Sequence, residues 1–377
     1  MIVAVNTRFL AEGGPEDVGN FIFDPIAIGC LSRLTEKFPQ HQFIYIFDKP
    51  FNKNLIFAKN VTTIITGPET KNTLLLQYWF NYKIPAVLRK HKADVFISMD
   101  GICSLRTKLP QCLFIHDLSF LQYPQLLKKA QVRFFKKFTS KFLAKAKSIA
   151  TVSQFSKSVI VDQYKISADK IDVVYSGINE IFKPIIPEEK ETIKEKYTEG
   201  KEYFFSPGNN NLNSNLINLL KAFSFFKKRQ KSNMMLLIAG KTDEPFKKDL
   251  ETFKFRNEVR LLENLSKEEL AKITAAAYAM VHPVFFDAVA MTPLQAMQCE
   301  VPVVSSNTGA LPELCGNAAL YFNPEDFKDI AEKMMLVFKD ENKAKELVKT
   351  GRIQSKFYYW DKTAGLLWQS LLKAVNN

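Results

Sequence analysis

The chain has 377 residues, more than one hydrophobic core usually organises, so its length predicts two domains of roughly 180 residues each. No run of about 18 uncharged apolar residues occurs, which argues against a membrane-spanning helix, and the formal net charge of +13 draws attention to anionic partners. Five cysteines with no C-x-x-C pair disfavour a disulfide scaffold or a zinc site and fit a reducing cytoplasm.

The first half of the chain alternates short β-branched and aromatic runs with longer helical patterns. Its opening segment lacks the basic start and the long apolar run of a signal peptide, so we expect a first core strand there. The expected strands cover residues 2–5, 42–47, 61–66, 94–98, 112–116, 148–152 and 171–175, with helices at 25–37 and 76–91 among the segments between them. This alternation predicts a parallel sheet covered by helices on both faces.

A basic segment lies between Asp117 and Asp162, where the sequence has no acidic residue. Its cations are Lys128, Lys129, Arg133, Lys136, Lys137, Lys141, Lys145, Lys147 and Lys157, with phenylalanines at 134, 135, 138 and 142. A helical period gathers the phenylalanines on one face. The ordinary interpretation is a core-packed helix with a solvated basic face. The alternative is that residues 128–147 attract an anionic membrane surface or a phosphate-bearing acceptor. Nucleic acid ranks last, because no nucleic-acid-binding motif accompanies the charge.

The second half begins with a charged stretch, 187–201, which we expect to form a hinge or linker that is partly helical. Strands follow at 203–206, 234–240, 259–262, 278–282, 301–306 and 319–322, with helices at 215–228 and 266–277 and a helical tail from 342. The helix at 266 starts with the capping-box pattern of Ser266 and Glu269. We therefore predict an α/β protein of two doubly wound, Rossmann-like domains facing across a cleft. The domains are 1–184 and 185–355, and a C-terminal helix, 356–377, packs back on the first domain.

Ligands of doubly wound domains bind at the carboxyl ends of the strands, and four loops fall there. The first contains Gly13, Gly14 and Gly19, whose small size lets backbone N–H groups approach a phosphate at a helix N-terminus. An ordinary glycine-containing turn explains it equally well, because the pattern is not G-x-G-x-x-G. That absence also argues against a dinucleotide-dependent oxidoreductase. The second loop carries His116, and a lone histidine is more often structural than functional.

The other two loops lie in the second half. Residues 206–215 are rich in asparagine, a residue that suits turns and helix caps. In residues 286–297 the polar side chains are Asp287, Thr292 and Gln295. Each loop is a weak signal by itself.

The order of short sequence motifs is more specific. From Met1 to about Trp360 the chain resembles family 4 of the retaining glycosyltransferases, which have the GT-B fold. The matching stretches are 6–10 (NTRFL), 114–118 (FIHDL), 150–156 (ATVSQFS), 170–177 (KIDVVYSG), 237–240 (LIAG), 291–297 (MTPLQAM), 301–313 (VPVVSSNTGALPE) and 318–324 (AALYFNP).

The resemblance implies that a nucleotide-diphosphate sugar is held by the second domain and a glycan or lipid-linked acceptor by the first. It implies transfer with retention of configuration, with neither a metal nor another cofactor. His116 and Asp287 are then the catalytic candidates. The donor-binding candidates are Gly13, Gly14, Gly19, Gly208, Asn213, Ser214, Ala288, Val289, Ala290, Met291, Thr292 and Gln295.

The donor motifs of this chain are degenerate. Asn213 and Ser214 stand where the family places an Arg/Lys pair, Asp287 and Gln295 where it has two glutamates, and residues 288–290 (AVA) replace Gly-Phe-Gly. Loss of both cations could cost about 4–10 kcal/mol of stabilisation of the diphosphate. Two hypotheses follow. One is a cytoplasmic glycosyltransferase, peripheral at the inner membrane face, that adds a hexose to a cell-surface polysaccharide or lipid-linked acceptor. The other is a catalytically impaired GT-B pseudoenzyme that serves as a glycan-binding or partner scaffold.

Overall fold

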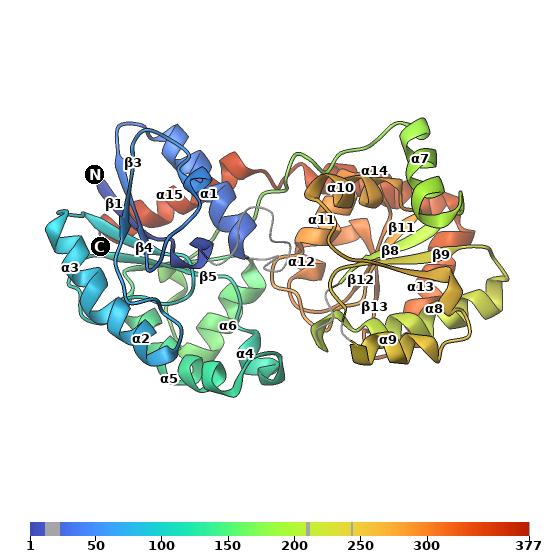
Figure 1. Ribbon diagram of the computed structural model, residues 1–377, viewed down its shortest axis with the longest axis horizontal. Helices are drawn as coiled ribbons and strands as arrows, with labels where there is room; N and C mark the ends of the chain where they lie inside the picture. Colours follow the sequence, from blue (N-terminus) through green and yellow to red (C-terminus); the bar gives the residue numbers. More distant parts are fainter. Residues whose placement is uncertain (12–22, 209–211, 243, 377) are drawn as a thin grey trace. The chain divides into compact units, whose positions relative to one another are not determined.

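The computed structural model describes residues 1–11, 23–208, 212–242 and 244–376. The chain divides into two compact units. The first comprises Met1–Gly177 and Trp360–Asn377, and the second Ile178–Tyr359 (Figure 1). Both chain termini therefore belong to the first unit. Each unit is a parallel sheet with helices along it, which confirms the predicted α/β class.

The sheet of the first unit has the strand order β3-β2-β1-β4-β5-β6-β7, and all neighbouring strands are parallel. Its strands are β1 (Ile2–Asn6), β2 (Gln42–Phe47), β3 (Val61–Ile65), β4 (Val95–Ser98), β5 (Gln111–Ile115), β6 (Ser148–Thr151) and β7 (Ile171–Val173). The central strands are buried along their length because helices cover both faces, as their continuous apolar runs predict. The order reverses between β1 and β4, so a crevice at the carboxyl ends of these strands is the expected ligand position.

The helices of the first unit are α1 (Phe23–Lys37), α2 (Thr73–Tyr78), α3 (Ile84–Lys90), α4 (Ser119–Gln122), α5 (Lys129–Lys145), α6 (Gln154–Tyr164) and α15 (Trp360–Asn376). A π-helical turn, η3 (Trp79–Lys83), joins α2 to α3, so the chain is helical from Thr73 to Lys90. Short 3-10 turns are η1 (Arg8–Ala11), η2 (Lys53–Leu55), η4 (Pro124–Leu126) and η5 (Ala168–Lys170).

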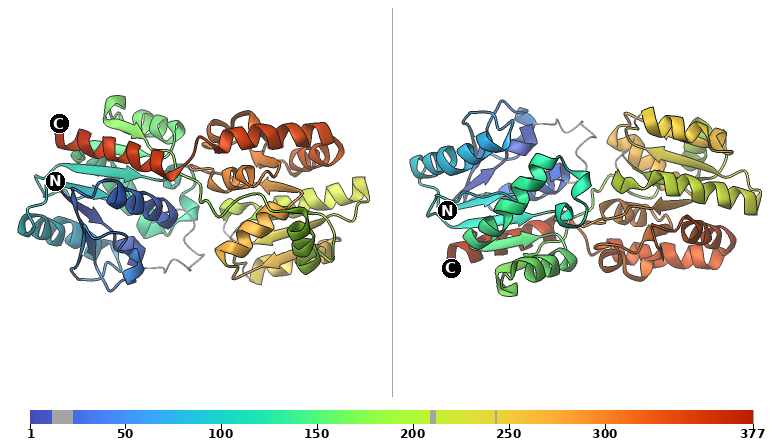
Figure 2. Two further views of the ribbon diagram at one scale, coloured as in Figure 1. Left: turned by 90° about the horizontal axis from the view of Figure 1, so that it is seen from above. Right: turned by 90° about the horizontal axis from the view of Figure 1, so that it is seen from below.

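The C-terminal helix α15 returns to the first unit (Figure 2). It packs against α1 and against β4 to β7. Trp360 lies so close to Gly29 and Gly177 that a Cβ atom at either glycine would come within 2.6 Å of it. Thr363 Oγ1 donates to the carbonyl of Tyr175 at 2.8 Å, and Lys373 pairs with Asp172 at 2.7 Å. The tail is thus an integral layer of the first unit.

The sheet of the second unit has the strand order β10-β9-β8-β11-β12-β13, again with parallel neighbours. Its strands are β8 (Tyr203–Pro207), β9 (Met235–Ala239), β10 (Val259–Leu262), β11 (Ala279–His282), β12 (Val303–Ser306) and β13 (Ala319–Phe322). Its helices are α7 (Pro187–Thr198), α8 (Leu216–Gln230), α9 (Glu244–Glu251), α10 (Lys267–Ala276), α11 (Met291–Gln298), α12 (Leu311–Cys315), α13 (Phe327–Lys339) and α14 (Glu341–Ser355). Three 3-10 turns, η6 (Leu212–Ser214), η7 (Arg256–Glu258) and η8 (Gly316–Ala318), complete it. The strand order reverses between β8 and β11.

The charged stretch 187–201 is not a linker, so the prediction of a hinge there was wrong, whereas its expected partly helical character is confirmed. Most of it forms α7, which lies inside the second unit and packs on α10. Ion pairs join this polar helix to its surroundings: Lys194 pairs with Glu202, which precedes β8, and Lys272 of α10 pairs with Glu189. The capping box of Ser266 and Glu269 at the start of α10 is confirmed. Within the described residues, no helix is both long and apolar enough to cross a bilayer.

Candidate functional site

The predicted site residues fall on both units, and each unit is taken by itself. Gly13, Gly14 and Gly19 lie outside the described residues. His116 directly follows β5 of the first unit. The other candidates surround the ends of β8 and β11 in the second unit.

His116 is buried, with its ring 4.3 Å from that of Phe114. Its Nε2 lies 2.7 Å from the carbonyl oxygen of Met99. Since a carbonyl only accepts, Nε2 carries the proton and donates. Burial lowers the pKa of His116 to about 3, against the smaller raising effect of the Met99 hydrogen bond. At neutral pH the imidazole is uncharged, so it suits positioning of a ligand better than supply of a cation.

A polar chain that the sequence analysis did not identify crosses the switch point of the first sheet. The parallel register sets Asn6 of β1 beside Ser98 of β4, and the Asn6 amide donates to Ser98 Oγ at 3.0 Å. Ser98 Oγ in turn donates to Asp100 at 3.0 Å. Arg8 meets the other oxygen of Asp100 with Nε and a terminal nitrogen at 2.9 and 2.8 Å.

Arg8 extends this series of polar contacts to Asp48, which directly follows β2. Its second terminal nitrogen donates to Thr70 Oγ1 at 3.1 Å, and Thr70 donates to Asp48 through Oγ1 and its backbone N–H at 2.6 and 2.7 Å. The side chains of Arg8 and Asp100 are only 14 % and 9 % exposed, so both are held in fixed positions. The signal available in the sequence was the position of Asn6 and Arg8 in the motif NTRFL, at the end of a buried strand and just beyond it.

In the second unit, Asn213 fastens two loops together. Its side-chain amide donates to the carbonyl of Phe286 and its side-chain oxygen accepts from the Phe286 N–H, both at 2.8 Å. Its own carbonyl accepts from Phe285 N–H at 3.0 Å. Asn213, which stands where the resemblance led us to expect a cation, therefore has a side chain whose polar atoms bond the neighbouring backbone. Ser214, next along the chain, is buried.

Asp287 has a similar role in its own loop. One carboxylate oxygen accepts the N–H groups of Val289 and Ala290 at 2.8 and 2.9 Å, and the other lies 3.0 Å from Nε2 of His282. Burial alone would raise the pKa of Asp287, but the His282 hydrogen bond, the charge of His282 and the two backbone amides outweigh it and lower the pKa. The backbone carbonyl of Asp287 accepts from Ala310 N–H at 2.8 Å. Asp287 thus shapes the loop that carries it.

The loop leads into α11 through Ala290, whose φ of 52° lies in the left-handed region that favours glycine. Gly309 fits against this loop, and a Cβ atom there would lie 2.2 Å from the carbonyl oxygen of Asp287. Ala288, Val289 and Ala290 are buried. The loop therefore retains a glycine-type turn without glycine in its sequence.

The remaining candidates lie at the ends of the same strands. Gly208 follows β8, and a Cβ atom there would be 3.1 Å from a flexible methyl of Leu216. Met291 and Thr292 form the first turn of α11, where helical N–H groups have no intrahelical acceptor. Gln295 is half-buried one turn further on. The structure thus brings Asn213, Asp287 and the start of α11 together at the switch point of the second sheet.

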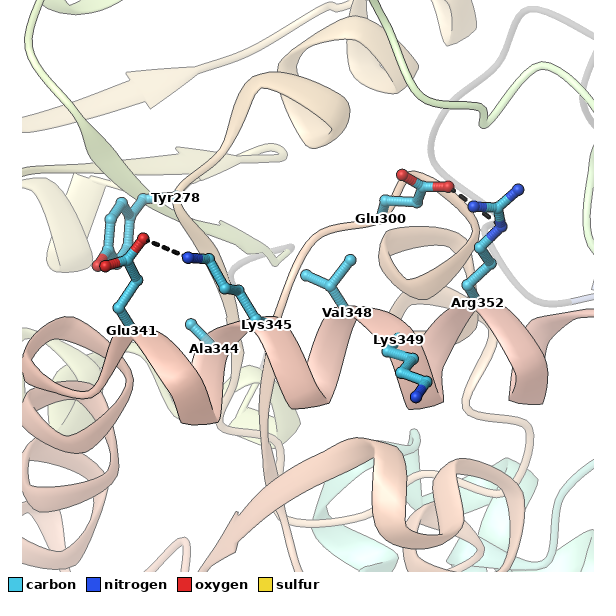
Figure 3. A pocket seen from close by; sticks show the side chains of 8 residues that line it. All are labelled: Tyr278, Glu300, Glu341, Ala344, Lys345, Val348, Lys349 and Arg352. Carbon is cyan, nitrogen blue, oxygen red and sulfur yellow. Dashed lines mark ion pairs between the residues drawn. The ribbon is translucent and has the colours of Figure 1, made fainter.

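A cavity of about 440 Å³ lies elsewhere in the second unit, along α14 (Figure 3). Its lining contains no predicted site residue. Two ion pairs, Lys345 with Glu341 and Arg352 with Glu300, neutralise much of its charge. A metal site has no support in the described ranges, where no cluster of three or more His, Cys, Asp or Glu side chains could hold an ion.

Comparison with known proteins identifies the kind of molecule. The model of glycosyl transferases group 1 matches residues 188–354, and that of glycosyltransferase family 4 matches residues 42–180. The chain is 28 % identical to the O-antigen chain mannosyltransferase B of Escherichia coli over 65 % of its own length and 66 % of that protein. It is 26 % identical to the O-antigen chain mannosyltransferase RfbU of Salmonella typhimurium over 71 % of its length and 72 % of that protein. The matches thus span about two thirds of each relative.

Solved structures agree in fold along the whole chain. WaaG, a glycosyltransferase involved in lipopolysaccharide biosynthesis, superposes with a TM-score of 0.74 at 13 % identity, covering 97 % of this chain and 98 % of WaaG. HepE of Anabaena in complex with UDP-glucose gives 0.74 at 15 % identity, covering 99 % of both chains. With two family models that together match most of both units and with this shared architecture, the chain belongs to the family-4-like glycosyltransferases of GT-B fold.

Proposed function

We propose that this protein transfers a hexose from a nucleotide-diphosphate sugar to a polysaccharide or lipid-linked glycan acceptor, with retention of configuration. The observation that carries the proposal is the meeting of the two loops that follow β8 and β11 at the switch point of the second sheet. Both loops lie within the segment matched by glycosyl transferases group 1. The names of the relatives, both O-antigen mannosyltransferases, support a surface polysaccharide as product and mannose as the sugar. The UDP-glucose in HepE supports a nucleotide-sugar donor.

The second unit supplies backbone groups for the diphosphate rather than charged side chains. Met291 and Thr292 have first-turn N–H groups, and the N-terminal end of a helix carries a partial positive charge. Together they would stabilise the negative charge that develops on the departing diphosphate. Gln295 can hydrogen-bond ribose hydroxyls. His116 would line the sugar as a neutral imidazole, and no metal or other cofactor enters this scheme.

The direct test is calorimetric titration with GDP-mannose and UDP-glucose. Without an Arg/Lys pair, we expect weak binding, with dissociation constants in the upper micromolar to millimolar range. A Thr292→Pro variant removes one of the two N–H groups and should weaken binding further. The matched control is Thr292→Ala, which keeps the N–H and should bind normally. Absence of heat with every donor at millimolar concentration would overturn the proposal.

A second candidate function is the pseudoenzyme scaffold. The observation that favours it is that the polar side-chain atoms of Asn213 and Asp287 already bond neighbouring protein groups, namely the backbone and His282. Restoring the family cation at the neighbouring position, Ser214→Lys, leaves the Asn213 contacts in place. It should strengthen nucleotide-diphosphate binding in a working donor site. Unchanged binding in a variant with a wild-type unfolding transition would favour the scaffold.

The proposed acceptor is linked to a lipid, and the basic segment 128–147 provides a surface suited to anionic lipid. It forms α5 and its flanks, with Phe134 and Phe142 buried and the lysines outward. The exposed cations are Lys128, Lys129, Arg133, Lys136, Lys137, Lys141 and Lys147. Such a surface would hold the protein at the face of the membrane that carries a lipid-linked acceptor.

A further inference from the structure

Three large side chains are exposed at regular spacing on the helical stretch from Thr73 to Lys90. Leu74, Tyr78 and Tyr82 are 75 %, 44 % and 49 % exposed. Side chains four residues apart lie on one side of a helix, and the Tyr78 and Tyr82 rings stack with centroids 5.3 Å apart. We call these three residues the apolar stripe. Its opposite side is core: Leu76, Trp79, Phe80, Ile84 and Val87 are buried.

The apolar stripe is held in place rather than loosely displayed. Asn72 caps α2 by accepting the N–H groups of Leu74 and Leu75, both at 3.0 Å. Between the two tyrosines, Trp79 Nε1 donates to the carbonyl of Thr66 at 2.6 Å. Asn81 accepts from Leu105 N–H at 2.9 Å. Exposure of these side chains is therefore a property of a fixed helix, and three such side chains on one face form a patch rather than scattered residues.

A cation lies beside each tyrosine of the apolar stripe. The guanidinium of Arg106 lies over the Tyr82 ring at 4.2 Å, and Nζ of Lys83 lies 5.9 Å from the centre of the Tyr78 ring. No acidic residue occurs between 70 and 93 in the sequence. The same stretch contacts α5, the basic helix, which also lacks acidic residues. Two neighbouring helices thus combine exposed tyrosines, a leucine and exposed lysines with no negative charge of their own.

We propose that the apolar stripe inserts into the headgroup region of an anionic bilayer while the lysines of α5 contact the lipid phosphates. Tyrosine suits this depth because its ring is apolar and its hydroxyl remains in contact with water. Leu74 adds apolar area, and the lysines add long-range attraction. This inference rests on the membrane contact in the proposed function, and it adds the segment that enters the lipid.

The two contributions differ in their response to salt, which allows them to be separated. Electrostatic attraction is screened at high ionic strength, whereas burial of apolar area persists. We therefore measure sedimentation of the full chain with vesicles of phosphatidylglycerol and phosphatidylcholine, at 0.1 M and 0.5 M salt. The wild-type protein should bind at low salt and keep part of this binding at high salt. Vesicles of phosphatidylcholine alone should bind weakly.

Two variants test the two parts. Leu74→Ser with Tyr78→Ser and Tyr82→Ser should lower the partition coefficient about tenfold or more and abolish the salt-resistant fraction. Lys136→Gln with Lys137→Gln and Lys141→Gln should lower the low-salt binding on the order of a hundredfold. The control carries the same change at Ile353, Phe357 and Tyr359 of the second unit, which are 54 %, 55 % and 52 % exposed. It should bind vesicles as the wild type does.

A third variant replaces one tyrosine by another large aromatic residue, so it does not truncate a side chain that is partly packed. Tyr82→Trp should gain fluorescence that brominated lipids quench, and Tyr359→Trp should not. If Tyr82→Trp is not quenched while vesicles bind, or if the stripe variant binds as the wild type does, the inference is overturned. It is also overturned if the stripe variant changes only a dimer into a monomer, since the stripe is then a contact between copies. Without vesicles, every variant should bind the nucleotide-sugar donor as the wild-type protein does. Failure of the proposed function would instead appear as absence of donor binding by the wild type.

Discussion

The carboxylate of Asp287 receives hydrogen bonds from three groups, and each of them loses its partner if the side chain is shortened. Val289 and Ala290 would keep buried N–H groups without acceptors, and His282 would lose its hydrogen bond. Asp287→Ala should therefore lower the free energy of unfolding by about 2–5 kcal/mol, measured by urea denaturation. The exposed helix cap Asp340, which accepts the N–H of Lys343, is the matched control, and Asp340→Ala should lower the free energy of unfolding by about 1 kcal/mol. Equal losses at both positions would contradict the structural role of Asp287.

His116 links stability to pH through its burial. Its pKa in the folded chain is about 3, below the ordinary value of 6.5. Between these values the unfolded chain binds a proton that the folded chain does not. The contribution of this residue to stability is therefore full above pH 6.5 and is lost progressively as the pH falls.

This linkage can be measured with His116→Gln, whose side-chain amide can also donate to the carbonyl of Met99. Between pH 7.5 and pH 5.5 the free energy of unfolding of the wild type should fall by about 1 kcal/mol more than that of the variant. Parallel curves for the two proteins would show that His116 titrates normally. In the activity profile, this histidine should produce no inflection near pH 6.5.

At the scale of the element, α11 begins from a left-handed residue that is not glycine. Ala290 has a φ of 52°, so its methyl group is strained, and glycine would relieve about 1 kcal/mol at the cost of extra freedom in the unfolded chain. Ala290→Gly should change the free energy of unfolding by less than about 1 kcal/mol. Ala296→Gly, in the interior of the same helix and equally buried, should cost at least 1 kcal/mol more. Unfolding midpoints of the two variants give the comparison, and the reverse order would contradict the strain at Ala290.

Most elements of this fold could be predicted from the sequence, because the chain alternates buried strands with amphipathic helices. The strands 42–47, 259–262 and 319–322 have the predicted bounds. The failure at 187–201 has a physical reason: α7 is mostly charged, and its pairing with Glu202 and Lys272 cannot be read from a period of apolar residues.

The candidate site was less predictable than the elements around it. The resemblance could point to positions 213 and 287, but it could not show where their polar atoms bond. Asn213 meets Phe286, which is 73 residues away in the sequence, and such a pairing exists only once two loops have folded beside each other. The Arg8 and Asp100 pair was missed for the same reason, since the partners lie 92 residues apart.

At the scale of the whole molecule, the chain passes from the first unit through the second and returns. The return requires a close fit, because α15 begins with Trp360 lying on α1. A Cβ atom at Gly29 would be 2.5 Å from the indole ring, and its three nearest neighbours are all side-chain atoms of Trp360. A methyl group added at Gly29 would therefore overlap with the Trp360 side chain alone, and this overlap makes the docking of α15 on α1 testable.

Gly29→Ala should destabilise the first unit although alanine favours a helix. The overlap with the ring should cost about 1–3 kcal/mol, more than the roughly 1 kcal/mol gained in helix propensity. In a Trp360→Leu background the overlap is removed, so the same substitution should become neutral or stabilising. Gly365→Ala in α15, where no atom lies within 4 Å of the added Cβ, is the control and should stabilise by about 1 kcal/mol in both backgrounds. A double-mutant cycle from urea denaturation measures the coupling between positions 29 and 360. A coupling near zero would mean that α15 does not dock on α1 in solution, because only that contact gives the two residues a reason to interact.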